Sequence, residues 1–447
     1  MRLERIEIAG FRGIKRLSLS FEQLTALIGE NTWGKSSLLD ALSVSLPAES
    51  ELYKFQLTDF HVDYSVAQTQ SQDLQIVLCF LANDVQETRS RRYRKIKPVW
   101  VTDAEGNHRI YYRLSASRED HNVTTTYDFL DANGDPLALH DADKIAHQII
   151  TLHPVIRLKD SRRFDRSKGV EHDLNERIEK RISNTCRRLM AIPGHVNKGE
   201  MKSSLKSMSM LVEHYFSFKP NARIEHAQPK DGVFYARKSD ELSINEYVER
   251  SNNKQTRLLL LGLLNAYLQA KGPNHFTRGA RPILIIEDPE GRLHPTQLAR
   301  AWGLLQLLPM QKILTTNSGH LLGQIPISSI RRLVRQSDKT ICTNMPTQGL
   351  SRDELRRVGF HIRFHRSNAL FARCWLLVEG ETEVWLFNEL ANQCGYNLAA
   401  EGVQIIEFAQ SGLKSLIKVA KAFGIDWHVV TDGDPAGKNM QRQYVRD

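Results

Sequence analysis

The residues GENTWGKS (29–36) follow the apolar run LTALI (24–28) and precede a helical pattern that begins at Lys35. They match G-x-x-x-x-G-K-S, and between a strand and a helix this pattern is typical of a phosphate-binding loop. The glycines let backbone N–H groups approach a phosphate closely, and the amino end of a helix favours negative charge. The stretch therefore predicts an α/β domain with a P-loop that binds ATP.

The loop also predicts which side chains hold the nucleotide. We expect Lys35 to reach the β- and γ-phosphates and Ser36 to coordinate Mg²⁺. The predicted nucleotide-binding residues further include Asn31, Gly34 and Ser37.

An acidic strand far downstream supplies the expected partner of the P-loop. The stretch ILIIEDPE (283–290) reads as a buried strand that ends in carboxylates. Glu287 is expected near the Mg²⁺, and Asp288 is expected to orient or deprotonate the attacking water. An ordinary strand ending in solvated acids would look the same in isolation, but the upstream P-loop favours the catalytic interpretation.

Composition narrows the class of protein. The chain has 447 residues, room for two to three domains, and a formal net charge of +10 that favours an anionic partner, usually nucleic acid. Its five cysteines are scattered, without the C-x-x-C pairs of a zinc ribbon. The start MRLERIEIAGF is charged, and no apolar run approaches the ~18 residues of a membrane span. We therefore expect a cytoplasmic protein without membrane contact.

A second set of acids points to a metal site. In CWLLVEGETE (374–383) an apolar strand delivers Glu379 at its carboxyl end, and Glu383 lies four residues on, in the following helix. A later strand ending near Val430 is followed by Asp432 and Asp434, which alternate and so point the same way. Four carboxylates suit Mg²⁺ or Mn²⁺, and two such ions could clamp a phosphodiester. Each acidic turn alone is more often a solvated loop, but their order around a strand–helix–strand–helix pattern is specific.

Several motifs together resemble the ABC-type ATPases of DNA metabolism, including chromosome-maintenance and recombination-mediator proteins. They are Gly10-Phe11-Arg12-Gly13, the P-loop and the distant acidic strand. In that group a signature loop of one nucleotide domain caps the ATP held by another. Here the signature position reads SNNKQ (251–255), and the switch strand TTNS (315–318) has Asn317 where a histidine is usual. Asn317 can hydrogen-bond a γ-phosphate but cannot carry charge, so we expect ATP binding with slow turnover.

The glutamate-bearing strand followed by a D-x-D strand resembles a TOPRIM domain, the metal fold of topoisomerases and primases. Its place after an insertion-bearing ABC ATPase resembles the overcoming-lysogenisation-defect (OLD) family of ATP-dependent nucleases. This resemblance covers the whole chain and implies Glu379, Glu383, Asp432 and Asp434 as metal ligands. It implies four segments: an ATPase part (1–170), a helical insertion for dimerisation (171–220), a second ATPase part (221–365) and a partial TOPRIM domain (366–447).

The leading interpretation is a hydrolase, an ATP-dependent and divalent-metal-dependent DNA endonuclease that assembles as a dimer or higher homo-oligomer. The family resemblance implies roles in phage defence and DNA repair. The catalytic residues would be Asp288, Glu379, Asp432 and Asp434. The alternative is an ATP-driven DNA clamp or loader that cuts nothing, and a primase-like TOPRIM protein ranks third. The basic stretches 89–97 and 157–168 are candidate DNA contacts, although a solvated charged face is the commoner explanation and the second stretch could instead lie near the nucleotide.

The family resemblance also implies further strands, another acidic or serine position and a lysine beyond Asp434. We therefore expect a shortened TOPRIM domain, poor packing of residues 426–447, and weaker metal binding and nuclease activity than in a full-length relative.

Overall fold

The computed structural model describes residues 1–48, 51–63, 70–120, 122–158, 280–291, 294–306, 310–346, 350–433 and 435. The expected helical insertion (171–220), the signature segment (251–255) and Asp434 lie outside the described residues. The chain forms two compact units. The first comprises Met1–Ser45, Tyr53–Ala146 and Ile313–Asp447, and the second comprises Leu46–Leu52 and His147–Lys312.

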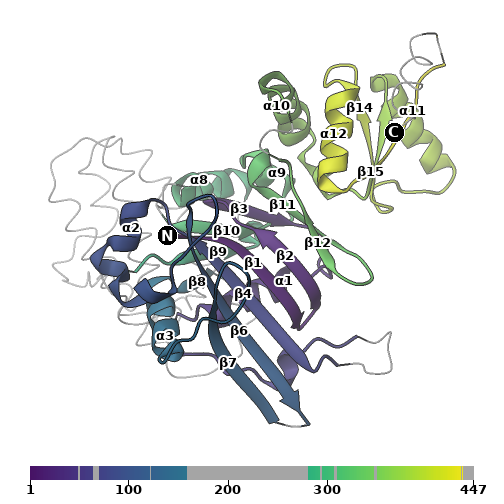
Figure 1. The fold of residues 1–447 in the computed structure, drawn as a ribbon. Helices are drawn as coiled ribbons and strands as arrows, with labels where there is room; N and C mark the ends of the chain where they lie inside the picture. Colours follow the sequence, from purple (N-terminus) through teal and green to yellow (C-terminus); the bar gives the residue numbers. More distant parts are fainter. Residues whose placement is uncertain are drawn as a thin grey trace, which may run out of the picture. The chain divides into compact units, whose positions relative to one another are not determined.

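An antiparallel sheet dominates the amino-terminal part of the first unit (Figure 1). Its strands run in the order β2-β1-β4-β6, with β5 and β7 both paired to β6. Residues alternate between buried and outward positions along β1 and β2, as expected for a sheet with one covered face. The strands are β1 (Arg2–Phe11), β2 (Ile14–Ser20), β4 (Asp73–Leu81), β5 (Val101–Thr102), β6 (His108–Glu119) and β7 (Asn122–Leu130).

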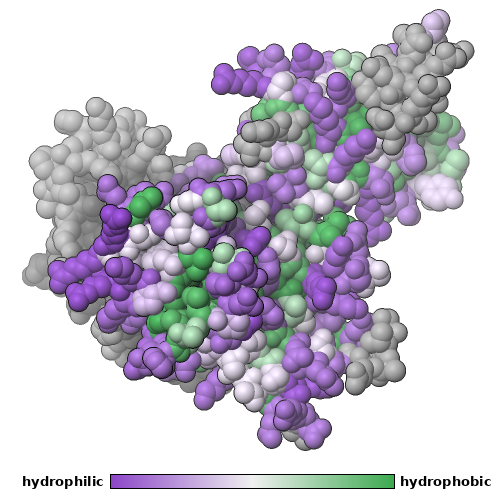
Figure 2. Space-filling model, viewed as in Figure 1, coloured by the Kyte–Doolittle hydropathy of each residue, from purple (hydrophilic) through white to green (hydrophobic). Residues whose placement is uncertain are grey.

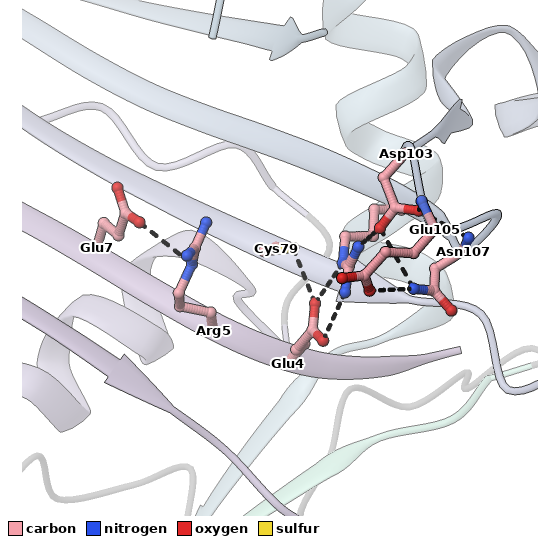
Figure 3. Close-up of polar contacts among 8 residues, drawn as sticks. Glu4, Arg5, Glu7, Cys79, Asp103, Glu105 and Asn107 are labelled. Atoms are coloured by element: carbon pink, nitrogen blue, oxygen red, sulfur yellow. Dashed lines mark hydrogen bonds and ion pairs between the residues drawn. The ribbon is translucent and has the colours of Figure 1, made fainter. Parts of the chain in front are cut away.

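A polar cluster ties three of these strands together (Figure 3). Arg109 on β6 donates to Glu4 on β1, from Nε to Oε2 at 2.7 Å and from Nη2 to Oε1 at 3.1 Å, and also pairs with Asp103. Cys79 on β4 donates its thiol to Glu4, and burial raises the pKa of Cys79 to about 12. The cluster therefore fixes the edge where β1, β4 and β6 meet, and it leaves Cys79 protonated at neutral pH.

This cluster predicts an acid-sensitive contribution to stability. Hydrogen bonds from Arg109 lower the pKa of Glu4 below its usual 4.5. Stability from the pair is therefore present above about pH 4.5 and is lost as the pH falls through the folded-state pKa. Glu4→Gln should lower the free energy of unfolding by about 1 kcal/mol at pH 7. Urea unfolding at pH 7 and at pH 3.5 checks this, because the difference from wild type should shrink at the lower pH.

The phosphate-binding loop belongs to a second sheet. Its strands run in the order β12-β11-β3-β10, with β11 parallel to β3 and antiparallel to β12, and β10 crosses the sequence boundary between the units. They are β3 (Leu24–Ile28), β10 (Gln311–Thr315), β11 (Ile330–Arg335) and β12 (Thr340–Thr343), and helix α1 (Lys35–Ser45) follows β3. In the second unit β8 (Val155–Leu158) pairs in parallel with β9 (Ile283–Glu287).

Short helices connect these strands. Those of the first unit are η1 (Leu57–Asp59), α2 (Val85–Arg89), η2 (Arg91–Val99), α9 (Gly319–Leu322), η5 (Ile327–Ser329), α10 (Arg352–Val358), the π-helix η6 (Gly359–His365) and η7 (Ser367–Phe371). The second unit contains η4 (Pro289–Gly291) and α8 (Pro295–Gln306), and α3 (Ala142–Leu152) crosses the sequence boundary between the units. None of the described helices is long and apolar enough to cross a bilayer.

A three-stranded parallel sheet forms the carboxy-terminal part of the first unit, in the order β14-β13-β15. Helices α11 and α12 flank it on either side (Figure 1). Trp375, Leu377 and Phe423 are fully buried in this part, so the strands have an apolar core of their own. The elements are β13 (Cys374–Val378), α11 (Glu381–Gln393), β14 (Val403–Glu407), α12 (Leu413–Phe423) and β15 (Asp426–Val429).

The predicted α/β class and the strand–helix order after residue 374 are confirmed. The predicted P-loop helix, from Lys35 to about Val44, is also confirmed, since α1 runs from Lys35 to Ser45. The strand expected at 283–286 extends by one residue, to Glu287. Packing is not uniformly poor in the segment 426–447, because β15 pairs in register with β13.

Candidate nucleotide and metal sites

Backbone geometry explains the glycines of the P-loop. Strand β3 ends at Ile28, and the chain then passes Gly29 with φ +140° and Gly34 with φ +92° before α1 begins. A Cβ on Gly34 would also come within 3.1 Å of Ile14 Cγ1. A side chain at Gly34 would therefore be strained both by the backbone conformation and by this neighbour. The first turn of α1 contains no acidic residue, so it suits an anion.

Lys35 is the first residue of α1, where the loop ends, and is only 6% exposed. Its Nζ donates to the carbonyl oxygen of Gly29 and to Oδ1 of Asn317 at 3.4 Å. Asn317 follows β10, so the switch strand and the P-loop meet although 282 residues separate them in sequence. A γ-phosphate held by Lys35 would be within reach of the Asn317 amide.

Other predicted nucleotide-binding residues occupy distinct places. Asn31 and Ser36 are exposed, Ser36 in the first turn of α1. Ser37 instead accepts a hydrogen bond at Oγ from the backbone N–H of Gly13 at 3.2 Å. Its hydroxyl therefore holds the loop that leads from β1 to β2, and its contact with a nucleotide stays a prediction.

Arg12 anchors this same loop, although sequence reasoning used it only as part of a family motif. Its φ is +45°, a conformation uncommon for a residue with a side chain. The guanidinium pairs with Asp40 on α1 and with Asp59, at 2.9 Å from Nη2 to Oδ1. Asp59 is fully buried and also accepts from the hydroxyl of Tyr53 at 2.9 Å. Arg12 therefore fixes the β1–β2 turn against the helix that follows the P-loop.

In the second unit the expected Walker B acid already has a cationic partner. Glu287 is the last residue of β9 and is buried. Arg157 on the neighbouring strand β8 donates to its carboxylate. Arg157 is therefore paired with Glu287 and is not part of an exposed DNA-binding surface. Asp288 follows with φ +41°, and its catalytic role stays a prediction.

The carboxy-terminal sheet brings two predicted metal ligands to one edge. Glu379 comes directly after β13 and is half-buried, and Asp432 is exposed beyond the end of β15. Strands β13 and β15 are parallel neighbours, and the backbone N–H of Val430 still donates to Leu377 at 2.8 Å. Both acids therefore leave the sheet at the carboxyl ends of adjacent strands, where α/β sheets bind ligands.

Glu383 makes a different contact. Its Oε2 accepts a hydrogen bond from the backbone N–H of Gly380 at 2.8 Å, the half of a capping box that the third residue of a helix supplies. In this structure Glu383 therefore stabilises the start of α11. Among the described residues, which exclude Asp434, no three His, Cys, Asp or Glu side chains gather closely enough to hold a metal ion. Convergence of all four predicted ligands stays a prediction.

A further strand-end acid was missed from the sequence. Glu407 is the last residue of β14, lies beside Val378 in the pairing register and is buried. Arg366 pairs with its carboxylate. The stretch VQIIE (403–407) repeats the apolar-strand-then-acid pattern of ILIIE (283–287) and WLLVE (375–379), and that signal could have found it.

Two family models match successive parts of the chain. Residues 1–369 match the family described as "Protein of unknown function (DUF2813)". Residues 370–434 match the "Overcoming lysogenization defect protein-like, TOPRIM domain".

Three curated relatives match nearly the full chain. YbjD of Escherichia coli K12 is 46% identical over 444 residues, covering 98% of this chain and 80% of YbjD. Endonuclease GajA of Bacillus cereus VD045 is 21% identical, covering 99% of this chain and 76% of GajA. The Old nuclease of Escherichia phage P2 is 22% identical, covering 97% of this chain and 77% of that nuclease.

Solved structures overlap with the fold in part. The SMC head domain from Thermotoga maritima has a TM-score of 0.38 at 14% identity, covering 78% of this chain and 100% of that domain. An SmcHead bound to the C-winged helix domain of ScpA has a TM-score of 0.41 at 13% identity, covering 78% of this chain and 99% of that head.

Proposed function

The chain belongs to the DUF2813 family and carries an OLD-like TOPRIM domain, and from this premise we propose that it is an ATP-binding, divalent-metal-dependent DNA endonuclease. The observation that carries the proposal is the position of Glu379 and Asp432 at the carboxyl ends of adjacent strands of the TOPRIM sheet. The relatives GajA and Old are named as nucleases, which supports the same reaction class for this chain.

The first unit supplies the groups that would hold the nucleotide. Backbone N–H groups between Gly29 and Gly34, with the amino end of α1, would cradle the phosphates. Lys35 would exchange its contact with the Gly29 carbonyl for a phosphate oxygen, and Ser36 would coordinate Mg²⁺. Asn317, already beside Lys35, would hydrogen-bond the γ-phosphate or the attacking water.

The TOPRIM sheet supplies the groups that would hold the catalytic cation. Glu379 and Asp432 offer hard carboxylate oxygens of the kind that Mg²⁺ and Mn²⁺ prefer. When bound there, such a cation supplies a Lewis acid and a water of lowered pKa. Asp434 completes the proposed set, and Glu383, whose Oε2 accepts from the N–H of Gly380, could join it through its other carboxylate oxygen.

A basic ridge on η2 is the proposed DNA contact in the first unit. Tyr93, Ile96 and Val99 are buried and anchor this helix. That anchoring leaves its cations exposed, namely Arg91, Arg94, Lys95 and Lys97. Figure 2 shows many hydrophilic residues in the region of α2, which directly precedes this helix. A row of exposed cations on a fixed helix suits the phosphate backbone of DNA.

The ridge makes a quantitative prediction. The double change Arg94→Gln and Lys95→Gln removes two cations that would each release about one counterion on binding. The slope of log affinity against log salt should fall by about two, with equal weakening across DNA sequences. Filter binding between 50 and 200 mM salt measures this. Arg352→Gln with Arg356→Gln, on the exposed surface of α10, is the matched control, and an equal loss in both pairs would contradict the proposal.

A plasmid nicking assay tests the proposed function itself. Supercoiled plasmid is incubated with the purified chain and Mg²⁺ or Mn²⁺, with and without ATP. We expect metal-dependent conversion to nicked circles that EDTA abolishes. If the chain leaves the plasmid intact with either metal while it binds ATP, the endonuclease proposal is wrong.

The second candidate function is an ATP-driven DNA clamp or loader without nuclease activity. Two contacts favour it: Glu383 caps α11, and an uncharged amide at Asn317 meets Lys35. A clamp would retain plasmid DNA on a filter only with ATP and would cleave none of it. By analogy with relatives of this family we further propose a homodimer or higher homo-oligomer.

A further inference from the structure

The phosphate-binding loop and the TOPRIM sheet share a buried arginine, Arg332. It lies on β11, where it pairs directly with Ile28, the last residue before the P-loop. Only 2% of its surface is exposed. Its guanidinium carbon lies 5.6 Å from the centroid of the Trp33 ring, a cation–π distance, and Trp33 precedes Gly34 within the loop. Arg332 therefore contacts the P-loop region twice: its backbone pairs with Ile28, and its charged guanidinium lies over the ring of Trp33.

The same guanidinium binds the TOPRIM part at three carbonyl oxygens. Nη1 donates to Phe423 at 2.9 Å and to Gly424 at 2.8 Å, and Nη2 donates to Ala372 at 2.9 Å. Ala372 lies two residues before β13, and Gly424 lies two residues before β15. Arg332 therefore holds together the starts of the two strands whose far ends carry Glu379 and Asp432.

A second contact runs parallel to the first. Arg373, the residue directly before β13, donates from Nε to Oε1 of Glu30 in the P-loop at 2.6 Å. The backbone of Arg373 also bonds both neighbouring segments: its N–H donates to Gly402, and its carbonyl accepts from Asp426. Its side chain is 64% exposed, so screening by water makes this ion pair weaker than the buried contacts of Arg332.

We propose that Arg332, assisted by Arg373, is a positioning residue that couples the P-loop to the spacing of Glu379 and Asp432. This inference rests on the proposed function, because it concerns the nucleotide and metal sites assigned above. If the loop closes around phosphates, Trp33 and Glu30 would move with it. Trp33 is connected to the starts of β13 and β15 through Arg332, and Glu30 is connected to the start of β13 through Arg373. By linkage, a nucleotide that shifts the strands changes their affinity for a cation, and a cation changes the affinity for nucleotide by the same factor.

The chemistry at this position requires an arginine. Three carbonyls in fixed directions match the planar fork of a guanidinium, whereas a lysine presents a single point of charge. Burial lowers the pKa of Arg332 to about 10, partly offset by Glu30 and Asp426. The side chain therefore remains charged at neutral pH, and its contact with Trp33 persists.

Hydrogen–deuterium exchange of the full chain tests the coupling, with a non-hydrolysable ATP analogue as probe. In the wild type, the analogue should change exchange of β13 and β15 amides at least threefold. Arg332→Lys should bind the analogue within about tenfold of wild type yet lose this change. Arg357→Gln, an exposed arginine on α10, is the matched control and should behave as wild type.

Other results would contradict the coupling. If folded Arg332→Lys shows the wild-type change in hydrogen exchange when the analogue binds, the coupling is wrong. If that variant does not fold, Arg373→Gln decides: its change should be at most half that of wild type, and an undiminished change overturns the coupling. A wild type that binds the analogue without any change in exchange contradicts the coupling alone. A wild type that does not bind the analogue contradicts both the coupling and the proposed nucleotide site.

Discussion

Glu379→Gln is expected to reduce metal-dependent plasmid nicking at least a hundredfold. Glu379 stands at the carboxyl end of β13, the central strand of the TOPRIM sheet, and glutamine keeps its size while removing the charge that binds a cation. A catalytic cation contributes several kcal/mol to the transition state, and about 1.4 kcal/mol corresponds to a tenfold change in rate. The initial rate of nicked-circle formation with Mg²⁺ and with Mn²⁺ measures the effect.

A matched variant separates loss of metal from loss of fold. Glu389→Gln changes an exposed glutamate on α11 and should cleave at the wild-type rate. Glu379→Gln should also still bind ATP, because the P-loop lies in a different sheet, and its affinity should change only by the factor of the coupling through Arg332. Wild-type nicking by Glu379→Gln would place the reaction elsewhere in the chain.

Lys35→Ala is expected to weaken ATP binding by roughly a hundredfold. A charge-assisted hydrogen bond to phosphate is worth about 1.5–3 kcal/mol, and Lys35 is buried at the point where the P-loop meets the switch residue Asn317. Titration with a fluorescent ATP analogue gives the dissociation constant. Lys414→Ala, an exposed lysine on α12, should bind as the wild type does.

Retention of tight binding by Lys35→Ala would show that the nucleotide sits elsewhere. The removed side chain also bonds the Gly29 carbonyl, so circular dichroism should first establish that the variant is folded. If ATP influences the nicking reaction only by binding to this loop, the nicking rate of Lys35→Ala should no longer depend on ATP.

Motifs with a strict local geometry were predictable from the sequence. The P-loop and its helix were, because the glycine spacing and the apolar strand before it leave few alternatives. Strand β13 was as well, because WLLVE has the length and apolar character of a buried parallel strand. The run before Asp432 was also predicted to be a buried strand, and there the burial was wrong, because β15 is an edge strand with half-buried and exposed residues. Lys35 and Asn317 were each predicted from the sequence to bind the nucleotide, whereas the hydrogen bond between them became known only from the fold.

Contacts that depend on a local turn of the chain or on the pairing of distant strands were not predictable. The capping bond of Glu383 depends on how the chain turns at Gly380, and the same acid could equally face a metal. Arg332 gave no signal, because a lone arginine in a β-strand is usually exposed, and only the pairing of β11 with β3 buries it against carbonyl oxygens. Arg157 was grouped with a basic run, whereas the pairing of β8 with β9 sets it against Glu287.

The most direct test is whether Glu379 and Asp432 together bind a divalent cation. Electron paramagnetic resonance of Mn²⁺, titrated with the full chain in the absence of nucleotide, reports the free ion. The wild type should bind at least one Mn²⁺ that the double variant Glu379→Gln and Asp432→Asn does not bind. Equal binding by the wild type and the double variant would contradict the metal site on which the proposed nuclease depends.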